Sequence, residues 1–494
     1  MPASRRGSGS VTLPSGTTLA IHTRTSPTQL KSDISSIQTM ADHLRKYEQL
    51  FTLTPQRMRM ITQAFSEVLD NGLKKHNQVV PMTPTFVFGW PTGNEVRHKP
   101  ARLSQGEGKF EIAQTKYRLT EEQKHDDGEK LFDFCAECLK TFIETNLSTV
   151  SEPGANVSLD TEEKDKKSIR VEQTESTGHT ETLLQPGQQL SLGFTVSSTS
   201  YYPCQERIDH GSIEKLDLPI NLTALINDTT GTLIASHYVN PRTKIAVIFG
   251  TGCNAAYMEK VSEITKIHDL GLDRSETGPY SEKGAIDSHL HEHLPRTKYD
   301  QIVDETSNKP GKQAFEKLIS GRYLGEILRL VICELIDEGV LFLGQNTYKL
   351  EKPYCFDTAF LSLMESDPTD ELLMIIGIFT HFFALETTLA ERQFFRALAR
   401  LVGRRAARLS ACGIAAIVTK MGYLDEGCSV GADGSLYNKY PGFADRVHEG
   451  LVDIFGDKGR NIVTHHAEDG SGVGSAIIAV MTKARKEAGI FSHV

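Results

Sequence analysis

The segment Ala224–Tyr257 places two apolar runs directly before polar, hydroxylated turns, and this order constrains the fold more than any other part of the chain. The first run, residues 222–226, ends at Asn227 and Asp228 and is followed by two threonines and a glycine. A buried strand that carries a carboxylate at its carboxyl end is typical of α/β enzymes, which bind ligands at that edge of the sheet. We therefore expect Asp228 to be catalytic, although an Asp at a helix start can also serve only as an N-cap.

A second buried strand is predicted over residues 245–249, and it breaks at Gly250, Thr251 and Gly252. Glycines in such a turn let backbone N–H groups approach a phosphate closely, and the threonine adds a hydroxyl donor. Asn254 follows with an amide that can both donate to and accept from a sugar hydroxyl. Taken alone, the glycines could form a simple turn, because short glycine motifs are weak evidence. Together, the two units suggest phosphoryl transfer to a hydroxyl group.

These motifs, LINDTTGTL and FGTGCNAAY, resemble in their order the core of the hexokinase family of sugar kinases. The resemblance implies an α/β fold with two actin-like ATPase lobes of the ribonuclease-H-like type. It implies that Asp228 is the catalytic base and that Asn227 and Asn254 bind the sugar. The substrates that it implies are glucose or a related hexose and ATP, with Mg²⁺ as the cofactor. The expected role is the first step of glycolysis.

Further motifs in the second half of the chain extend the resemblance. Glu282 in EKGAID and Glu316 in PGKQAFEK match carboxylates that accept hydrogen bonds from sugar hydroxyls in that family. Gly434 and Ser435 in GADGSLY match a loop that lies against adenosine, and AEDGSG opens the last helix. The resemblance therefore implies nucleotide contacts at Gly250, Thr251, Gly252, Gly434 and Ser435. Both late loops combine glycines with a helix N-terminus, which suits nucleotide binding.

Two segments depart from the family pattern. Residues 95–108 contain no apolar run that could form a strand, although the family has two strands and a phosphate loop there. Residues 211–216 pass directly toward the next strand without the family's catalytic lysine, and Lys215 is not its equivalent. Three hypotheses follow: an active hexose kinase, a non-catalytic sugar-binding regulator, or a sequence that lost two internal segments, for example through a wrongly assigned exon. In the third case the intact protein is an ordinary kinase.

The length of 494 residues predicts more than one lobe. We expect a disordered tail over residues 1–31, an N-terminal lobe over 32–226 and a C-terminal lobe over 227–494. The N-terminal lobe is interrupted by a polar, charge-rich insertion at 151–190, which we expect to be mobile because it has little apolar surface to bury.

Composition limits the partners. Asp and Glu number 63 against 54 Lys and Arg, so a nucleic-acid partner is not expected. No apolar run approaches the roughly 20 residues that a membrane span requires. Eight scattered cysteines favour the cytoplasm, and Cys135 and Cys138 are expected on an amphipathic helix rather than in a metal site. His289, His291 and His293 alternate but lack further ligands, so no metal site is expected there. The sequence does not decide between a monomer and a homodimer.

Overall fold

The computed structural model describes most of the chain from Thr39 onward, together with two short strands before it. The described residues are 10–12, 18–20, 39–76, 78, 80, 82–85, 87–91, 117, 119–120, 128–148, 190–196, 216, 218–270, 273–275, 277–282, 293–467 and 469–489. Residues 95–108, His289, His291 and nearly all of 151–190 and 211–216 lie outside this set. Within 1–31, only β1 (Ser10–Thr12) and β2 (Thr18–Ala20) are described, and they pair antiparallel.

A six-stranded mixed sheet forms the centre of the molecule, in the order β10-β9-β6-β7-β8-β3. Strands β6, β9 and β10 are parallel, whereas β7, β8 and β3 continue the sheet antiparallel. Their bounds are β3 Thr83–Pro84, β6 Thr243–Phe249, β7 Cys253–Lys260, β8 Thr277–Glu282, β9 Cys428–Asp433 and β10 Ile462–His466. The predicted strand at 245–249 is confirmed as β6, at the middle of this sheet.

Helices cover both faces of the sheet, which explains why β6 is an almost continuous apolar run. Ile245 and Val247 are fully or almost fully buried in the large core that includes α3 and α16. Ala246 points to the other face, where it packs with Leu233 of α9. The helices concerned are α2 Met40–Phe51, α3 Pro55–Lys74, α9 Asp228–Val239, α16 Leu389–Met421, α18 Phe443–Phe455 and α19 Gly470–Glu487.

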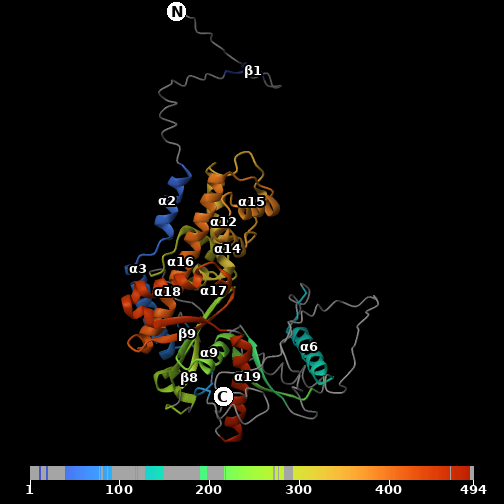
Figure 1. Ribbon diagram of the computed structural model, residues 1–494, viewed down its shortest axis with the longest axis vertical. Coiled ribbons are helices and arrows are strands. Elements are labelled where there is room, and N and C mark those ends of the chain that lie inside the picture. The colour runs from blue at the N-terminus through green and yellow to red at the C-terminus, as the bar shows by residue number, and fades with distance from the viewer. Residues whose placement is uncertain are drawn as a thin grey trace, which may run out of the picture.

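A second, parallel sheet pairs β4 (Leu190–Val196) with β5 (Ile220–Asn227). Helix α6 (Gly128–Ser148) covers it through Ile143, which packs against Ile220. Figure 1 shows α6 set apart from the six-stranded sheet, with α9 and α19 between them. Among the described residues this sheet has two strands. Residues 95–108, which are not expected to form the two further strands of the family, lie outside the description.

Helices α9 and α19 cross at unusually close range. A Cβ added to Gly474 would lie 1.9 Å from the carbonyl oxygen of Gly231, and one added to Gly193 would lie 2.1 Å from that of Ser475. Only glycine allows backbones to approach this closely. The glycine-rich start of α19 therefore has a packing role between the two sheets.

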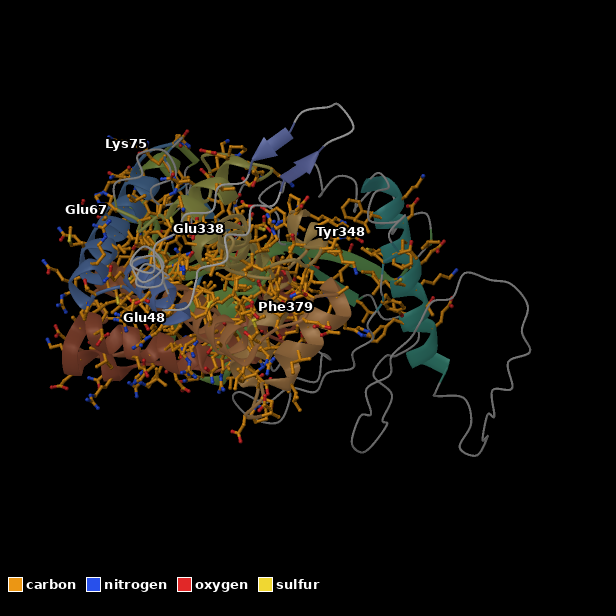
Figure 2. All side chains as sticks on the ribbon, turned by 90° about the horizontal axis from the view of Figure 1, so that it is seen from above. Glu48, Glu67, Lys75, Glu338, Tyr348 and Phe379 are labelled. Atoms are coloured by element: carbon orange, nitrogen blue, oxygen red, sulfur yellow. The ribbon has the colours of Figure 1, made fainter. Side chains whose placement is uncertain are left out.

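A helical region completes the larger body, at the top of Figure 1. Figure 2, seen from above, labels Phe379, which is fully buried, over the middle of the molecule and Glu67 and Lys75 near its edge. The remaining elements are α10 Lys298–Glu305, α11 Ala314–Ile319, α12 Gly321–Asp337, α13 Tyr348–Glu351, α14 Thr358–Ser366, α15 Leu373–Gly377, the π-helix Ile378–Phe383, α17 Ser435–Lys439 and the 3-10 turns Val261–Glu263, Thr265–Leu270 and Gly456–Asn461.

The prediction for Cys135 and Cys138 is confirmed, because both lie half-buried on α6 as free thiols. Helix α3 begins at Pro55 with Thr54 as its N-cap. Helix α16, Leu389–Met421, is one continuous helix of 33 residues. Across the described residues, no helix is both long and apolar enough to span a membrane. The division into lobes at residues 226 and 227 stays a prediction.

Candidate active site

Asn227 and Asp228 lie where β5 ends and α9 begins. Asn227 is the N-cap, and its Oδ1 accepts a 3.0 Å hydrogen bond from the backbone N–H of Thr229. Asp228 occupies the first helical turn, and its Oδ1 accepts from the same N–H at 2.8 Å and from the Thr229 hydroxyl at 3.2 Å. The positive end of the helix favours a carboxylate at this position. Both side chains therefore bind the start of α9, and the catalytic role of Asp228 stays a prediction.

Asn254 connects this helix start to the central sheet. Its Nδ2 donates to Oδ1 of Asn227 at 3.0 Å, and its own Oδ1 accepts from the N–H of Ala255 at 2.9 Å. Asn227 is 2% exposed, whereas Asn254 is half-buried. The two amides predicted to bind sugar are thus in direct contact.

Glu316 approaches the same place from α11. Its Oε2 accepts a 3.0 Å bond from the N–H of Cys253, the residue before Asn254, and its Oε1 accepts from Gln313 at 3.2 Å. A Cβ on Gly252 would lie 2.9 Å from Oε2, so a glycine there lets the carboxylate reach the loop. Glu282 has its backbone opposite Ala255 in the β7–β8 ladder, and its side chain lies outside the description.

The turn after β6 is held by the start of α12. The carbonyl oxygen of Gly250 accepts from the N–H of Gly321 at 2.7 Å, and that of Thr251 accepts from Arg322 at 3.2 Å. Gly434 lies against the same turn with φ of +108°, and a Cβ on it would be 2.4 Å from the carbonyl oxygen of Phe249. This conformation and this contact both require glycine. The two glycine motifs, far apart in sequence, are therefore neighbours.

A cavity of about 600 Å³ opens beside these motifs, a size that suits a nucleotide. Thr251 and Ser435 line it, so two of the predicted nucleotide contacts share one cavity. Its other lining residues are Gly321, Arg322, Tyr354, Phe356, Asp357, Thr358, Ala359, Ser362, Leu363, Leu436, Lys439 and Tyr440. Arg322 and Lys439 bring positive charge, which favours an anionic ligand.

Comparison with known proteins shows which family the chain resembles. Two hexokinase family profiles match the chain, one over residues 43–238 and the other over 244–481. The chain is 37% identical to Hexokinase-1 of Schizosaccharomyces pombe, over 92% of this chain and 94% of that protein. It is 39% identical to the hexokinase of Kluyveromyces lactis, over 91% of this chain and 94% of that protein.

The chain belongs to the hexokinase family. A solved hexokinase from Schistosoma mansoni, complexed with glucose, shares the fold at a TM-score of 0.71 with 24% identity, covering 89% of this chain and 98% of that one. A second hexokinase crystal structure has a TM-score of 0.61 with 20% identity, covering 90% and 99%. The expected fold class, two actin-like α/β lobes, and the assignment to sugar-phosphorylating, ATP-dependent enzymes are confirmed.

Some residues that line the cavity beside Thr251 and Ser435 were not predicted as site residues. Arg322, Lys439 and Tyr440 follow matched motifs directly, so their positions in SGRYLGE and after GADGSLY were the available signal. Burial raises the pKa of Tyr354, and the nearby Glu326 raises it further, so this phenol remains a neutral hydrogen-bond donor. The backbone N–H of Tyr354 donates to Glu326 at 2.7 Å.

A site with three metal-binding side chains is absent from the described part of the protein. No three His, Cys, Asp or Glu side chains converge there in a way that could hold an ion. We assign no residue to the metal.

The single tryptophan of the chain, Trp90, packs against α9. Trp90 stacks on His237 with ring centroids 3.7 Å apart, and the ammonium of Lys244 lies 5.4 Å from its ring. Burial lowers the pKa of His237, whose Nδ1 lies 2.8 Å from the carbonyl oxygen of Thr243. Because Trp90 contacts the helix that begins at Asp228, a ligand that shifts α9 is expected to change Trp90 fluorescence.

Proposed function

We propose that this protein transfers the γ-phosphoryl group of ATP to the 6-hydroxyl of glucose or a related hexose, with Asp228 as the general base. The observation that carries the proposal is the chain of contacts from Asn227 to Asn254 and from Cys253 to Glu316. These contacts link the predicted sugar-binding residues Asn227, Asn254 and Glu316, and Asn227 directly precedes Asp228 in the chain. The turn at Thr251, which connects β6 to β7, lines the cavity proposed for ATP.

In the proposed reaction Asp228 accepts the proton of the 6-hydroxyl as the sugar oxygen forms a bond to the γ-phosphorus. The bond from that phosphorus to the bridging oxygen breaks, and ADP leaves. Asn227, Asn254, Glu282 and Glu316 hold the sugar hydroxyls. Catalysis of this kind is mainly positioning and electrostatic stabilisation, so the fixed contacts of these side chains matter directly.

The cavity suggests how ATP binds. We assign adenosine to the loop of Gly434 and Ser435, and the phosphates to the turn at Gly250, Thr251 and Gly252. Positive charge from Arg322 and Lys439 suits the phosphate chain. Mg²⁺ is expected to arrive bound to the phosphates of ATP, because it commonly binds substrate phosphates and few protein ligands.

A second candidate function is sugar binding without turnover. It is favoured by the sequence itself, since residues 95–108 lack a phosphate-loop pattern and residues 211–216 lack the family's catalytic lysine. Loss of two internal segments from an ordinary kinase would produce the same departures, and sequencing the transcript across residues 95–109 and 211–216 separates these two cases. We propose the cytoplasm and the first step of glycolysis for the kinase, whether monomer or homodimer.

The deciding experiment measures ATP-dependent glucose phosphorylation by the purified full chain and by Asp228→Asn. Turnover that the substitution abolishes supports the kinase. Glucose binding without turnover, followed through Trp90 fluorescence, supports the regulator. Loss of both binding and turnover in the unmodified chain rejects both functions for this sequence and points to a damaged chain.

A further inference from the structure

We propose that Glu365 is a positioning residue for nucleotide binding, because it holds together the two walls of the cavity lined by Thr251 and Ser435. The inference rests on the proposed function, since it assigns this cavity to ATP. Glu365 itself does not line the cavity. It acts through Tyr440, which does.

Glu365 lies near the end of α14 and is a buried carboxylate, with a side chain only 2% exposed. Its Oε1 accepts a 2.8 Å hydrogen bond from the hydroxyl of Tyr440. Arg446 of α18 donates to both oxygens, at 3.2 Å and 2.5 Å, and Nε of Arg400 lies 3.9 Å from Oε2. One carboxylate thereby connects α14, the end of α17, α18 and α16.

The two walls of the cavity come from the elements that Glu365 connects. Helix α14 supplies Thr358, Ala359, Ser362 and Leu363 to one wall, and α17 with Tyr440 supplies the other. A weaker bond joins them elsewhere, from the Ser362 hydroxyl to the carbonyl oxygen of Lys439 at 3.5 Å. Of these two hydrogen bonds, the one between Glu365 and Tyr440 is the shorter and therefore the stronger.

Tyr440 packs closely against α16. A Cβ added to Gly403 of α16 would lie 2.4 Å from the Tyr440 hydroxyl oxygen, so the phenol fits only over a glycine. The hydroxyl also lies 3.2 Å from the carbonyl oxygen of Ala399. Burial and the adjacent Glu365 raise the pKa of Tyr440 well above its usual value, so it remains a neutral donor to the carboxylate.

The negative charge of Glu365 is necessary for this arrangement. Arg446 is largely buried, and a buried guanidinium left without its carboxylate is strongly unfavourable. Glu365→Gln would keep the size of the side chain but leave Arg446 without its charged partner. Tyr440→Phe would keep the ring and Arg446 pairing, and would remove only the hydroxyl that connects the wall to Glu365.

The test compares ATP and glucose affinities of the full chain with those of Glu365→Gln, Tyr440→Phe and the matched control Asp300→Asn. Asp300 is also buried and pairs with Arg405 through two 2.8 Å bonds, but it does not line the cavity. ATP binding is measured by calorimetry, glucose binding by Trp90 fluorescence and stability by urea unfolding.

We expect Tyr440→Phe to weaken ATP binding about fivefold to tenfold, as loss of a buried hydrogen bond predicts. Glu365→Gln should weaken ATP binding at least as much, because Arg446 then lacks its charged partner. Glucose affinity should stay within about twofold, because the sugar contacts are made elsewhere. Asp300→Asn should lower stability and leave both affinities unchanged. ATP affinity unchanged in Tyr440→Phe would overturn the inference even if Glu365→Gln fails to fold. An unmodified chain that binds glucose but no ATP would instead overturn the proposed kinase, and this inference with it.

Discussion

Asn254 donates a 3.0 Å hydrogen bond from Nδ2 to Oδ1 of Asn227, and this contact joins the second residue of β7 to the last residue of β5. The two strands belong to different sheets. The contact therefore connects the two sheets directly beside Asp228, at the place where the proposed sugar site requires side chains from both.

Replacing Asn254 by Ala should weaken glucose binding about tenfold to a hundredfold, because it removes a sugar contact and a partner of the buried Asn227. Trp90 fluorescence during a glucose titration measures the change. Asn240→Ala is the matched control, since Asn240 is the C-cap at the other end of α9 and bonds to Ser429 at 3.2 Å. Equal glucose affinity in Asn254→Ala and the unmodified chain would contradict the assignment.

Gly252→Ala should raise the KM for glucose, whereas Gly250→Ala should have a smaller effect on it. The added Cβ at 252 would lie 2.9 Å from Oε2 of Glu316 and displace that carboxylate, while at 250 the nearest atom is 3.6 Å away. We expect an increase of about tenfold for Gly252→Ala, the effect of one disturbed hydrogen-bonding group. Steady-state kinetics with glucose varied checks this. If the two alanine variants have the same KM, Glu316 does not act through this loop.

Gly474→Ala should lower the free energy of unfolding by about 1–3 kcal/mol or more, because overpacking forces helices apart. Its Cβ would lie 1.9 Å from the carbonyl oxygen of Gly231. Gly377→Ala serves as the control, since its Cβ meets no atom within 4 Å. Urea unfolding measures both variants. A Gly474→Ala protein as stable as Gly377→Ala would show that α9 and α19 are not in close contact.

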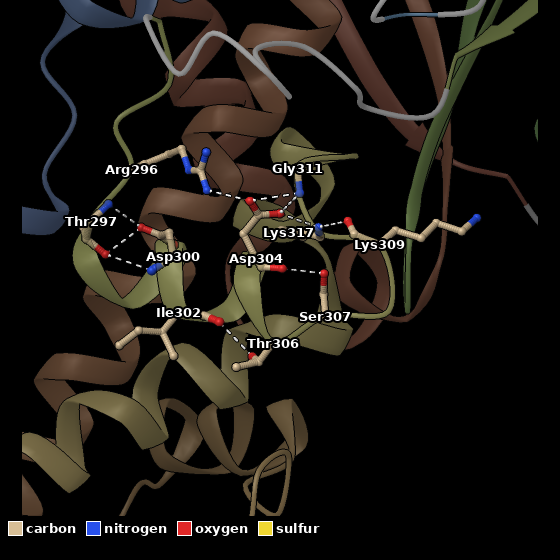
Figure 3. Close-up of polar contacts among 10 residues, drawn as sticks. All are labelled: Arg296, Thr297, Asp300, Ile302, Asp304, Thr306, Ser307, Lys309, Gly311 and Lys317. Carbon is tan, nitrogen blue, oxygen red and sulfur yellow. Dashed lines mark hydrogen bonds and ion pairs between the residues drawn. The ribbon is translucent and has the colours of Figure 1, made fainter.

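The stability that Asp304 contributes to the fold should be lost in acid. Burial by itself raises the pKa of this carboxyl, but Lys317 and Arg296 outweigh burial, and the net pKa is lowered from 3.8. Figure 3 shows Asp304 between these two cations, with Arg296 at 3.0 Å and Lys317 at 2.5 Å. Because the folded-state pKa is the lower one, the stabilisation is complete well above pH 3.8 and is lost as the pH falls through the folded-state value.

We therefore expect Asp304→Asn to reduce stability at pH 7 and to make stability depend less on pH below about 5. Asp425→Asn is the control, because the Asp425 side chain is 82% exposed in its pair with Lys458 and exposed pairs contribute little. Urea unfolding between pH 7 and pH 3 compares the two. An unchanged pH profile in Asp304→Asn would mean that its lowered pKa does not contribute to stability.

Much of the local structure could be predicted from residue patterns. The strand ending at Asn227, the strand over 245–249, the helix starting at Pro55 and the helix around Cys135 all follow from apolar periodicity and N-cap residues, which act within a few positions of the chain. The resemblance of the motifs then indicated the fold class and the sugar-kinase function. The outcome for residues 95–108 remains a prediction, as do the roles of the individual site residues.

Contacts between distant segments could not be predicted in this way. No local pattern shows that the Tyr440 hydroxyl reaches Glu365, 75 positions earlier in the chain, or that Gly474 must fit against Gly231. The sequence by itself determined the elements, the residue types at the proposed site and the family. Only the tertiary structure decided which side chains meet. Hydrogen bonds and close backbone approaches require that elements far apart along the chain be positioned to within a few tenths of an ångström.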